Sequence, residues 1–411
     1  MKKIFKIALA ILTVLGLKSC SDDNNIGESE NPPVTITKKE VIDNYAKLVY
    51  QNYLGSYNAA VILQTSIKNF TDAPSQNGLD KVKADWLAAR EIYGQSEVFR
   101  GSNGPVDSEG GESWAVNNEG QMNAWPLDEG YIDYVTPASD AYSGYSSYNG
   151  GIIAGTSVIN ETLLIDKNEK ENDKSISTGW HAIEFLIWGQ DETNPSELKA
   201  GQRPLTDYTT DTNKERRKVY LNVVTSILVK DLKKLVDTWA QGGEYYSVFM
   251  GLSEKEALIN ILSGPFFLAN EELSEERMLK PVDLTDGIDN SGQEDEHSCF
   301  SDNTHRDVVT NAQGIINVLF GTYGTIKGAS IYDLIKQEDA ALANNLKTAA
   351  DAMMLKINEI DSKANNNKPF DLLLQEESIS DPGTIVSAGS ALKSFGGTIS
   401  EGALKIGISL N

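Results

Sequence analysis

Apolar side chains recur with a helical period along most of the chain, and strand-like alternation is scarce. The first stripe follows Thr37-Lys-Lys-Glu40, whose residue types form a capping box at a helix start. Its apolar members are Val41, Ile42, Tyr45, Leu48, Val49 and Tyr53. Similar patterns, two of them opened by capping boxes at Thr212 and Ser253, predict helices at about residues 79–100, 151–164, 212–241, 253–279, 306–320, 338–361 and 382–395. The sequence therefore predicts an all-α fold.

One long stretch interrupts this helical pattern. Residues 101–151 contain nine glycines and no helical period, together with Trp114, Trp125 and five tyrosines. A loop of this length in a compact domain is usually functional or disordered. We interpret it as a surface insertion with short helical pieces. The alternative is a lid that contacts a ligand.

A second polar stretch, residues 191–210, contains two prolines and one glycine and predicts a domain boundary. We expect an N-terminal helical bundle at residues 37–205 and a C-terminal helical bundle at residues 206–411. The length of the chain, 411 residues, suits two domains.

The two halves of the chain share an order of short motifs. Arg100 is followed by Pro105-Val-Asp107 and a Gly-rich loop, and Arg277 is followed by Pro281-Val-Asp283 and a Gly-rich loop. The later members are Gly120-Gln121, Asp128 and Asp133 in the first half and Gly292-Gln293, Asp302 and Asp307 in the second. This order predicts two fused helical bundles related by a pseudo-twofold duplication, with their loop-rich ends facing each other. Convergent helix–loop composition is the alternative.

The first twenty residues have the composition of a targeting segment. Lysines at positions 2, 3 and 6 precede an apolar run at residues 7–17, which is too short to span a bilayer. The run leads into Leu17-Lys-Ser-Cys20, which resembles a lipobox. We expect a lipoprotein signal peptide at residues 1–19, lipidation of Cys20 and a polar tether at residues 20–36. The protein would then be an outer-membrane lipoprotein of the cell envelope, exposed at the cell surface. The alternative is a secretory peptide with a coincidental cysteine.

The charge balance bears on the partners. The chain has 36 basic and 59 acidic residues and a net charge of −23. Removal of residues 1–19 would take four lysines with it, which gives 32 − 59, or −27. Such an acidic surface argues against nucleic acid as a partner and is compatible with cation binding. Apart from Cys20, Cys299 is the only cysteine, so no disulfide framework is expected.

The apolar run at residues 176–188 predicts a buried helix that carries two titratable groups. Residues three or four apart share a helix face, so Ser177, His181, Glu184 and Trp188 form one stripe. A buried carboxylate is costly unless it is paired, protonated or bound to a metal. The structural alternative is that His181 and Glu184 pair with each other and with an arginine of the core.

All three histidines of the chain lie beside carboxylates. His297 and His305 belong to one polar stretch, residues 293–305, which is rich in acids. Neutral imidazole and carboxylate are ligands for Fe, Mn, Zn or Cu. The predicted metal ligands are His181, Glu184, Glu294, Glu296 and His297. We expect Asp302 and His305 to support the site or to cap the helix that begins near Arg306.

The pattern Gly-x-His-x-x-Glu at residues 179–184 resembles the signature of the imelysin family. Asn123-Ala-Trp-Pro-Leu-Asp128 and Gly201-Gln-Arg-Pro204 strengthen the resemblance, which runs over nearly all of the chain from about residue 38. It implies an all-helical fold of two fused bundles and an envelope or surface protein linked to iron uptake. It also implies a metallopeptidase, because imelysin itself is classed as an insulin-cleaving membrane metallopeptidase.

Three functions compete for this sequence. The first is a lipoprotein that binds a metal ion or an iron compound between the bundles, with Gly179 in support and other envelope proteins as further partners. The second is a metallopeptidase, but a hydrolytic zinc needs about three protein ligands, and His-Glu-x-x-His and His-x-x-Glu-His are both absent. The third is a helical adaptor. The ligand spacing favours the first. If the two histidine motifs lie apart, Arg203 is the expected partner of the His181 helix.

The lipobox predicts how the protein fractionates in cells. Replacing Cys20 with alanine should move the protein from the membrane fraction into the soluble fraction, because the lipid anchor would be lost. The measurement is fractionation of cells that express the wild type or the variant, followed by immunoblotting. A variant that still sediments with membranes in high salt would contradict the anchor.

Overall fold

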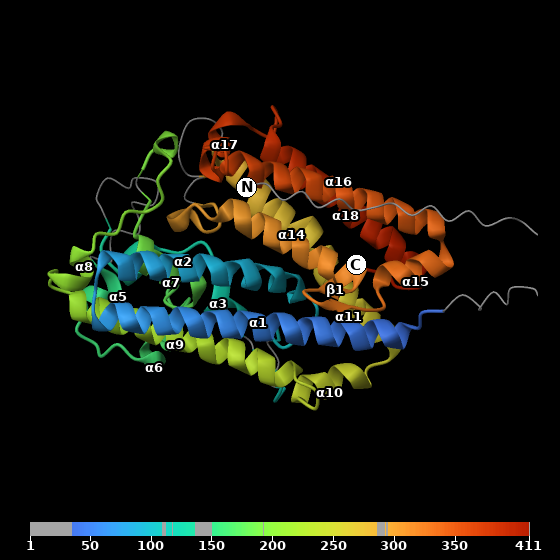
Figure 1. Cartoon of the computed structure of the whole chain (residues 1–411), viewed down its shortest axis with the longest axis horizontal. Helices are drawn as coiled ribbons and strands as arrows, with labels where there is room; N and C mark the ends of the chain where they lie inside the picture. The colour runs from blue at the N-terminus through green and yellow to red at the C-terminus, as the bar shows by residue number, and fades with distance from the viewer. Residues whose placement is uncertain are drawn as a thin grey trace, which may run out of the picture. The chain divides into compact units, whose positions relative to one another are not determined.

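The computed structural model describes residues 35–108, 112–116, 118–135, 150–191, 193–285, 292 and 295–410. The expected signal peptide and Cys20 lie outside these residues. Ile36–Asn411 form one compact unit. It is built from helices, which confirms the all-α prediction, and its described strands are the two short strands of one antiparallel hairpin (Figure 1). None of the helices in the described part is long and apolar enough to cross a bilayer.

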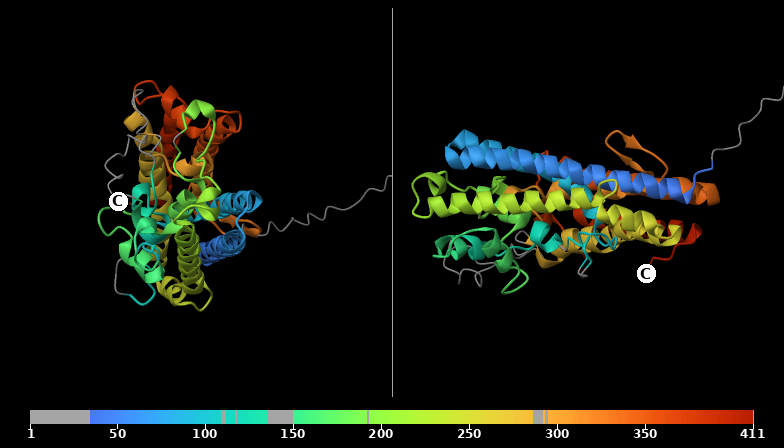
Figure 2. Two further views of the ribbon diagram at one scale, coloured as in Figure 1. Left: turned by 90° about the vertical axis from the view of Figure 1, so that its left-hand side faces the viewer. Right: turned by 90° about the horizontal axis from the view of Figure 1, so that it is seen from below.

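Helices form two layers (Figures 1 and 2). The first layer contains α1 (Lys38–Asp72), α2 (Gln76–Tyr93), α9 (Lys214–Trp239) and α10 (Glu244–Gly251). The second contains η4 (Leu268–Leu279), α12 (Lys280–Thr285), α14 (Thr304–Phe320), α15 (Ile331–Glu338), α16 (Ala340–Ala364), α17 (Phe370–Glu376) and α18 (Thr384–Lys405). α11 (Glu254–Phe267) leads from one to the other and contacts α1, α14 and α18. Within the layers, α1 packs against α2 and α9, and α16 packs against α18.

Short elements connect the long helices. They are η1 (Gly94–Phe99), α3 (Glu119–Asn123), α4 (Glu129–Ile132), α5 (Gly151–Ala154), α6 (Glu161–Lys167), α7 (Gly179–Trp188), η3 (Pro195–Glu197), α8 (Thr206–Thr209), η5 (Cys299–Ser301), β1 (Thr322–Tyr323) and β2 (Ile326–Lys327). In the hairpin, Thr322 pairs with Lys327. The layers meet where α14 packs against η1 and α2.

Several predicted helix starts match the structure, and others differ. Thr37 and Ser253 cap α1 and α11 with complete capping boxes, as predicted. The capping box expected at Thr212 is absent, because α9 begins after Asn213 without a side-chain cap. The single helix expected at residues 151–164 is two helices, because the side chain of Asn160 caps a new helix, α6.

The predicted boundary near residue 205 falls just before α8. α9, which follows that residue in the chain, packs against α1 and α7, which precede it. The helices on both sides of the boundary therefore lie together in space. The division into two bundles at this residue and the duplication both stay predictions.

The described part of the Gly-rich stretch at residues 101–151 is not the surface insertion that we expected. It does contain short helical pieces, α3 and α4, but Met122, Leu127 and Ile132 are buried in the core. An irregular segment that lines the interior has no helical period, so its burial could not be seen in the pattern. The tyrosines at positions 142, 145 and 148 lie outside the described residues.

α7 carries the predicted buried motif, and every residue of this helix is buried. Its first residue, Gly179, has φ of 88°, and a Cβ there would lie 2.4 Å from the carbonyl oxygen of Met122. Only glycine fits both conditions. Because α7 packs against α2, α3 and α9, it holds its polar side chains inside the protein.

Replacing Gly179 with alanine should therefore destabilise the protein by about 2 kcal/mol or more, since a positive φ costs an L-residue about 1–3 kcal/mol before any clash. Denaturant unfolding measures the change. Gly397→Ala is the matched control, because Gly397 is an exposed residue of α18 whose added Cβ would meet nothing within 4 Å. The control should be neutral or stabilising by up to about 1 kcal/mol. Equal effects of the two substitutions would contradict this account of Gly179.

Candidate functional site

Two imidazoles from distant parts of the chain face each other in the interior. His181 lies on α7 and His297 lies just before η5, and both are buried. Nε2 of His181 is 3.2 Å from Nε2 of His297. The structure thus brings together the two histidine motifs that the sequence analysis expected to meet.

A carboxylate holds the other nitrogen of each ring. Nδ1 of His181 is 2.8 Å from Oε2 of Glu184, and Nδ1 of His297 is 2.8 Å from Oδ2 of Asp307 on α14. Ser301 donates to Oε1 of Glu184 from its backbone nitrogen at 3.0 Å and from its hydroxyl at 2.6 Å. We call Glu184, His181, His297 and Asp307 the buried row. It connects α7 with α14.

Asp307 anchors one end of the buried row through an ion pair with α2. Its Oδ2 atom accepts from Nη2 of Arg90 at 2.8 Å and from the hydroxyl of Ser298 at 2.6 Å. Arg90 and Asp307 are only 1% and 2% exposed, so the pair is shielded from water. Burial alone would raise the pKa of Asp307, but the charge of Arg90 and the bond from His297 outweigh it and hold the pKa below its usual range.

A second buried ion pair connects the layers close by. Arg277 of η4 donates to Oε2 of Glu97 in η1 at 2.7 Å and to Asn311 at 2.5 Å. Asn123 joins the two pairs, because it accepts from Arg90 at 2.6 Å and donates to Glu97 at 3.3 Å. The buried row therefore belongs to one hydrogen-bonded network that extends across both layers.

Burial also sets the protonation of the row. Desolvation raises the pKa of Glu184 to about 8, although the bonds from Ser301 lower it. Desolvation lowers the pKa of His297 to about 4 and that of His181 well below its usual value. At neutral pH, Glu184 is then protonated, both rings are neutral, and Asp307 is ionised.

This protonation state gives every contact of the row one donor and one acceptor. The hydroxyl of Glu184 donates to Nδ1 of His181, and the Nε2–H group of His181 donates to Nε2 of His297. The Nδ1–H group of His297 then donates to the carboxylate of Asp307. If Glu184 were ionised instead, two bare Nε2 atoms would face each other, and they would need a cation between them.

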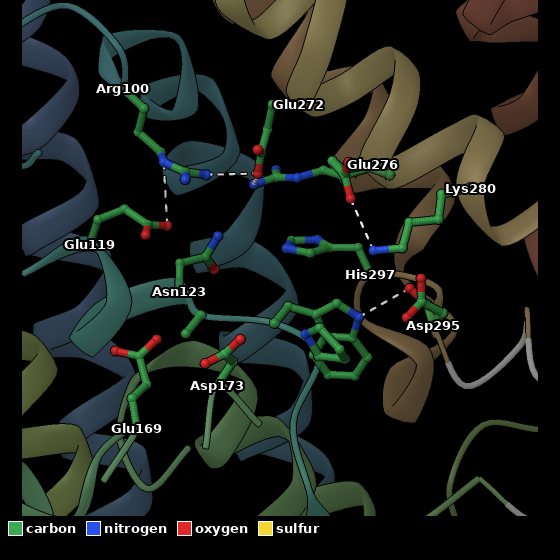
Figure 3. Close-up of a pocket in the computed structure, with 14 residues that line it drawn as sticks. Arg100, Glu119, Asn123, Glu169, Asp173, Glu272, Glu276, Lys280, Asp295 and His297 are labelled. Atoms are coloured by element: carbon green, nitrogen blue, oxygen red, sulfur yellow. Dashed lines mark hydrogen bonds and ion pairs between the residues drawn. The ribbon is translucent and has the colours of Figure 1, made fainter. Parts of the chain in front are cut away.

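Trp125 and a cleft lie beside the imidazoles. The ring centroid of Trp125 is 4.8 Å from that of His181, and its N–H group donates to the backbone oxygen of Asp295 at 3.1 Å. His297 and Trp125 both line a cleft of about 270 Å³ (Figure 3). The charged lining residues are Arg100, Arg277, Lys280, Glu119, Glu169, Glu272, Glu276, Asp173 and Asp295. Six acids against three bases make this cleft negative, and His297 is part of its wall.

Two predicted supporting residues lie apart from the buried row. Nδ1 of His305 is 3.0 Å from the backbone oxygen of Asp302, and its Nε2 is 3.9 Å from Asp361. We expected these two residues to support the site or to cap the next helix, but neither of them caps it. α14 begins at Thr304 after the N-cap residue Asn303, so Asp302 lies before the cap position and His305 lies inside the first turn.

The outcome differs for each of the three remaining predicted residues. Glu294 lies outside the described residues. Glu296 is buried, and its Oε2 atom has no hydrogen-bond partner among the described residues. Arg203 pairs with Asp133 at 2.8 Å and donates to the carbonyl of Phe185 at 3.3 Å, so it supports the end of α7 rather than the row.

Some residues of the network escaped the sequence analysis. Asn123 belongs to a motif that carries the family resemblance, and Asp307 belongs to the internal repeat, so each gave a signal whose meaning was not recognised. Arg90 and Ser301 gave no signal, because their contacts with the row depend on how distant segments fold together.

The comparisons with known proteins identify the family. The chain matches the family model described as Peptidase_M75: Imelysin over residues 49–382. This match covers more than half of the chain, so the protein belongs to the imelysin family, and the predicted resemblance is confirmed.

Curated and solved relatives agree with this assignment. "Iron-regulated protein A" of Synechococcus elongatus is 21% identical over 316 residues, which cover 76% of this chain and 72% of the relative. A solved putative iron-regulated protein A precursor from Parabacteroides distasonis has a TM-score of 0.62 at 19% identity and covers 90% of this chain and 97% of its own. An imelysin-like protein from Psychrobacter arcticum has a TM-score of 0.59 at 12% identity, with 91% and 96% covered. These two structures show that the fold is shared.

In metal-free protein, Glu184→Gln should gain stability relative to the wild type as the pH rises from about 4.5 to 8. The folded wild type holds a proton on Glu184 that the unfolded chain releases above pH 4.5, so the contribution of Glu184 to the stability of the wild type is lost as the pH rises through this window. The loss is on the order of a few kcal/mol, at about 1.4 kcal/mol per pKa unit. Glutamine keeps the bonds to Ser301 and His181 but does not titrate.

Urea unfolding across this pH window measures the effect. Glu401→Gln, an exposed residue of α18, is the control and should follow the wild type. If the stability of Glu184→Gln changed with pH in parallel with the wild type, the raised pKa of Glu184 would be wrong.

Proposed function

We propose that this protein binds a transition-metal ion or an iron compound at His181 and His297, and that this binding serves iron uptake. The observation that carries the proposal is the 3.2 Å separation of the two Nε2 atoms, with a carboxylate on the far side of each ring. Histidines that ligate metals almost always donate their other ring nitrogen to such a partner, which fixes the ring and raises its basicity.

The two donors fit a metal ion. Two nitrogens bound at about 2.0–2.1 Å to one tetrahedral ion lie about 3.3 Å apart. This separation is close to the 3.2 Å between the Nε2 atoms of His181 and His297. Imidazole nitrogens suit Fe, Zn and Cu, and Mn where carboxylates or water contribute. Among the described residues, no group of three ligand atoms includes this pair. Water or donor atoms of a bound compound would complete the coordination.

Binding requires that neither Nε2 atom carries a proton, so His181 must lose the Nε2 proton that it donates to His297 in the free row. His181 would then carry its proton on Nδ1 and donate it to an ionised Glu184, while His297 continues to donate to Asp307. The row would release one proton, so affinity should rise with pH. The ionised Glu184 thus accepts the hydrogen bond that leaves Nε2 of His181 free to bind the metal.

Two further observations support iron as the metal. The cleft that reaches His297 is negative, which favours a cationic ligand. A curated relative and one solved relative both carry the name iron-regulated protein A. Because Cys20 ends a sequence that resembles a lipobox, we also propose that the protein acts at the outer membrane as a lipoprotein.

The family description favours a peptidase as a second candidate. A hydrolytic zinc site uses about three protein ligands and an open water position. At this pair, the described residues supply two protein ligands, His181 and His297, rather than three. We therefore favour binding over hydrolysis.

Metal titration tests the proposal. Chelator-treated protein should bind one Fe²⁺ per chain under anaerobic conditions, and His181→Ala and His297→Ala should each weaken binding at least tenfold. The double variant should be no weaker than either single variant, because each substitution alone dismantles the same site. Isothermal titration calorimetry gives the affinities, with Zn²⁺, Mn²⁺ and Cu²⁺ in parallel.

His305→Ala is the matched control, because His305 is the third histidine and contacts Asp302 and Asp361 rather than the row. It should bind Fe²⁺ like the wild type. The proposal fails if none of the four ions binds, or if all three alanine variants bind equally well. Cleavage of insulin that is lost in Glu184→Gln would establish the peptidase instead.

A further inference from the structure

Three aspartates converge at a place that the buried row does not use. Asp191 lies just after α7, Asp302 follows η5, and Asp371 lies in the first turn of α17. One carboxylate oxygen of each lies within 4.8 Å of the others. Such a group of anions from three separate segments is unfavourable unless protons or a cation neutralise it.

A fourth carboxyl group lies beside them. Glu296 is 1% exposed, and its Oε2 atom has no hydrogen-bond partner among the described residues. After desolvation, the charges of Asp371, Asp302 and Asp191 do most to raise its pKa, ahead of Glu184. A buried polar atom without a partner is costly, so this one indicates a missing ligand. The Oδ1 atom of Asp302 is likewise buried and unpartnered in the described part of the chain.

Three of these four carboxyl groups have no basic partner in the described part of the chain. Among the described residues, neither Glu296, Asp302 nor Asp371 forms an ion pair with a lysine or an arginine. Backbone amides hold two of the aspartates in place. The amide of Leu372 donates to Asp371 at 2.7 Å, and the amide of Thr193 donates to Asp191 at 3.1 Å. The oxygens are therefore held close together, and protons or a cation must offset their charge.

We propose that Asp191, Asp302 and Asp371, with Glu296 beside them, form a second metal site that binds Ca²⁺ independently of the two histidines. Carboxylate oxygens without nitrogen or sulfur donors suit a hard cation. Two ligands of one Ca²⁺ lie at most about 5 Å apart, whereas those of Mg²⁺ lie at most about 4.2 Å apart. The three oxygens lie within 4.8 Å of one another, which the coordination shell of Ca²⁺ accommodates.

The site would fasten the segment that carries His297. Asp302 directly follows Ser301, which donates to Glu184, and η5 packs against α7. A bound ion would tie this segment to α17 and to the end of α7. Ca²⁺ would therefore stabilise the fold around the buried row without contacting it.

Calcium titration of the full mature protein after treatment with a chelator tests the inference. The wild type should bind one Ca²⁺ per chain, and a hundredfold excess over Kd should raise Tm by a few degrees, on the order of 3 °C. Asp371→Asn should bind at least tenfold more weakly, because it removes one anionic ligand and keeps the bond from Leu372. Asp351→Asn, an exposed residue of α16, is the matched control and should bind like the wild type.

The histidine variants separate this site from the proposed function. His181→Ala should still bind Ca²⁺, and Asp371→Asn should still bind Fe²⁺, so either site can fail alone. The inference is overturned if Ca²⁺ neither binds nor raises Tm, if Asp371→Asn binds Ca²⁺ like the wild type, or if Mg²⁺ binds more tightly than Ca²⁺. Loss of Ca²⁺ binding in His181→Ala alone would also overturn it.

Discussion

The ion pair between Arg90 and Asp307 is the interaction on which the site depends. It joins α2 to α14 at 2.8 Å in the interior, and the same carboxylate oxygen holds His297 in place. Loss of one partner of a buried pair leaves an uncompensated charge and costs about 3–5 kcal/mol. The carboxylate of this pair orients the imidazole of His297, and this imidazole in turn meets His181. In this region, the same residues determine the packing, the charge balance and the geometry of the site.

The part of the site that follows from local geometry could be predicted from the sequence. His181 and Glu184 lie three residues apart in an apolar run, so any helix there places both on one face and buries both. The concentration of the remaining histidines in one acidic stretch then indicated His297 as a partner. The all-α fold followed from the same helical periodicity, and capping boxes located the starts of α1 and α11.

The rest depends on contacts between distant segments. Arg90 lies in the amphipathic pattern of α2 and resembles any helix arginine until Asp307 is placed beside it. Asn123 lies in a Gly-rich stretch without periodicity, so its burial between Arg90 and Glu97 was not visible. The grouping of Asp302 with Asp371 arises only when α17 packs near η5, which no spacing in the sequence encodes. Local patterns thus identified the imidazoles, and tertiary packing determined which carboxylates serve them.

The central claim is that His181 and His297 are joint ligands of one metal ion. Anomalous scattering from crystals soaked with Fe²⁺, recorded at the iron absorption edge, tests it most directly. The account predicts one peak at about 2.0–2.2 Å from Nε2 of both rings, with Glu184 and Asp307 still bonded to the Nδ1 atoms. A peak confined to another part of the molecule, with the two Nε2 atoms still hydrogen-bonded to each other, would contradict it.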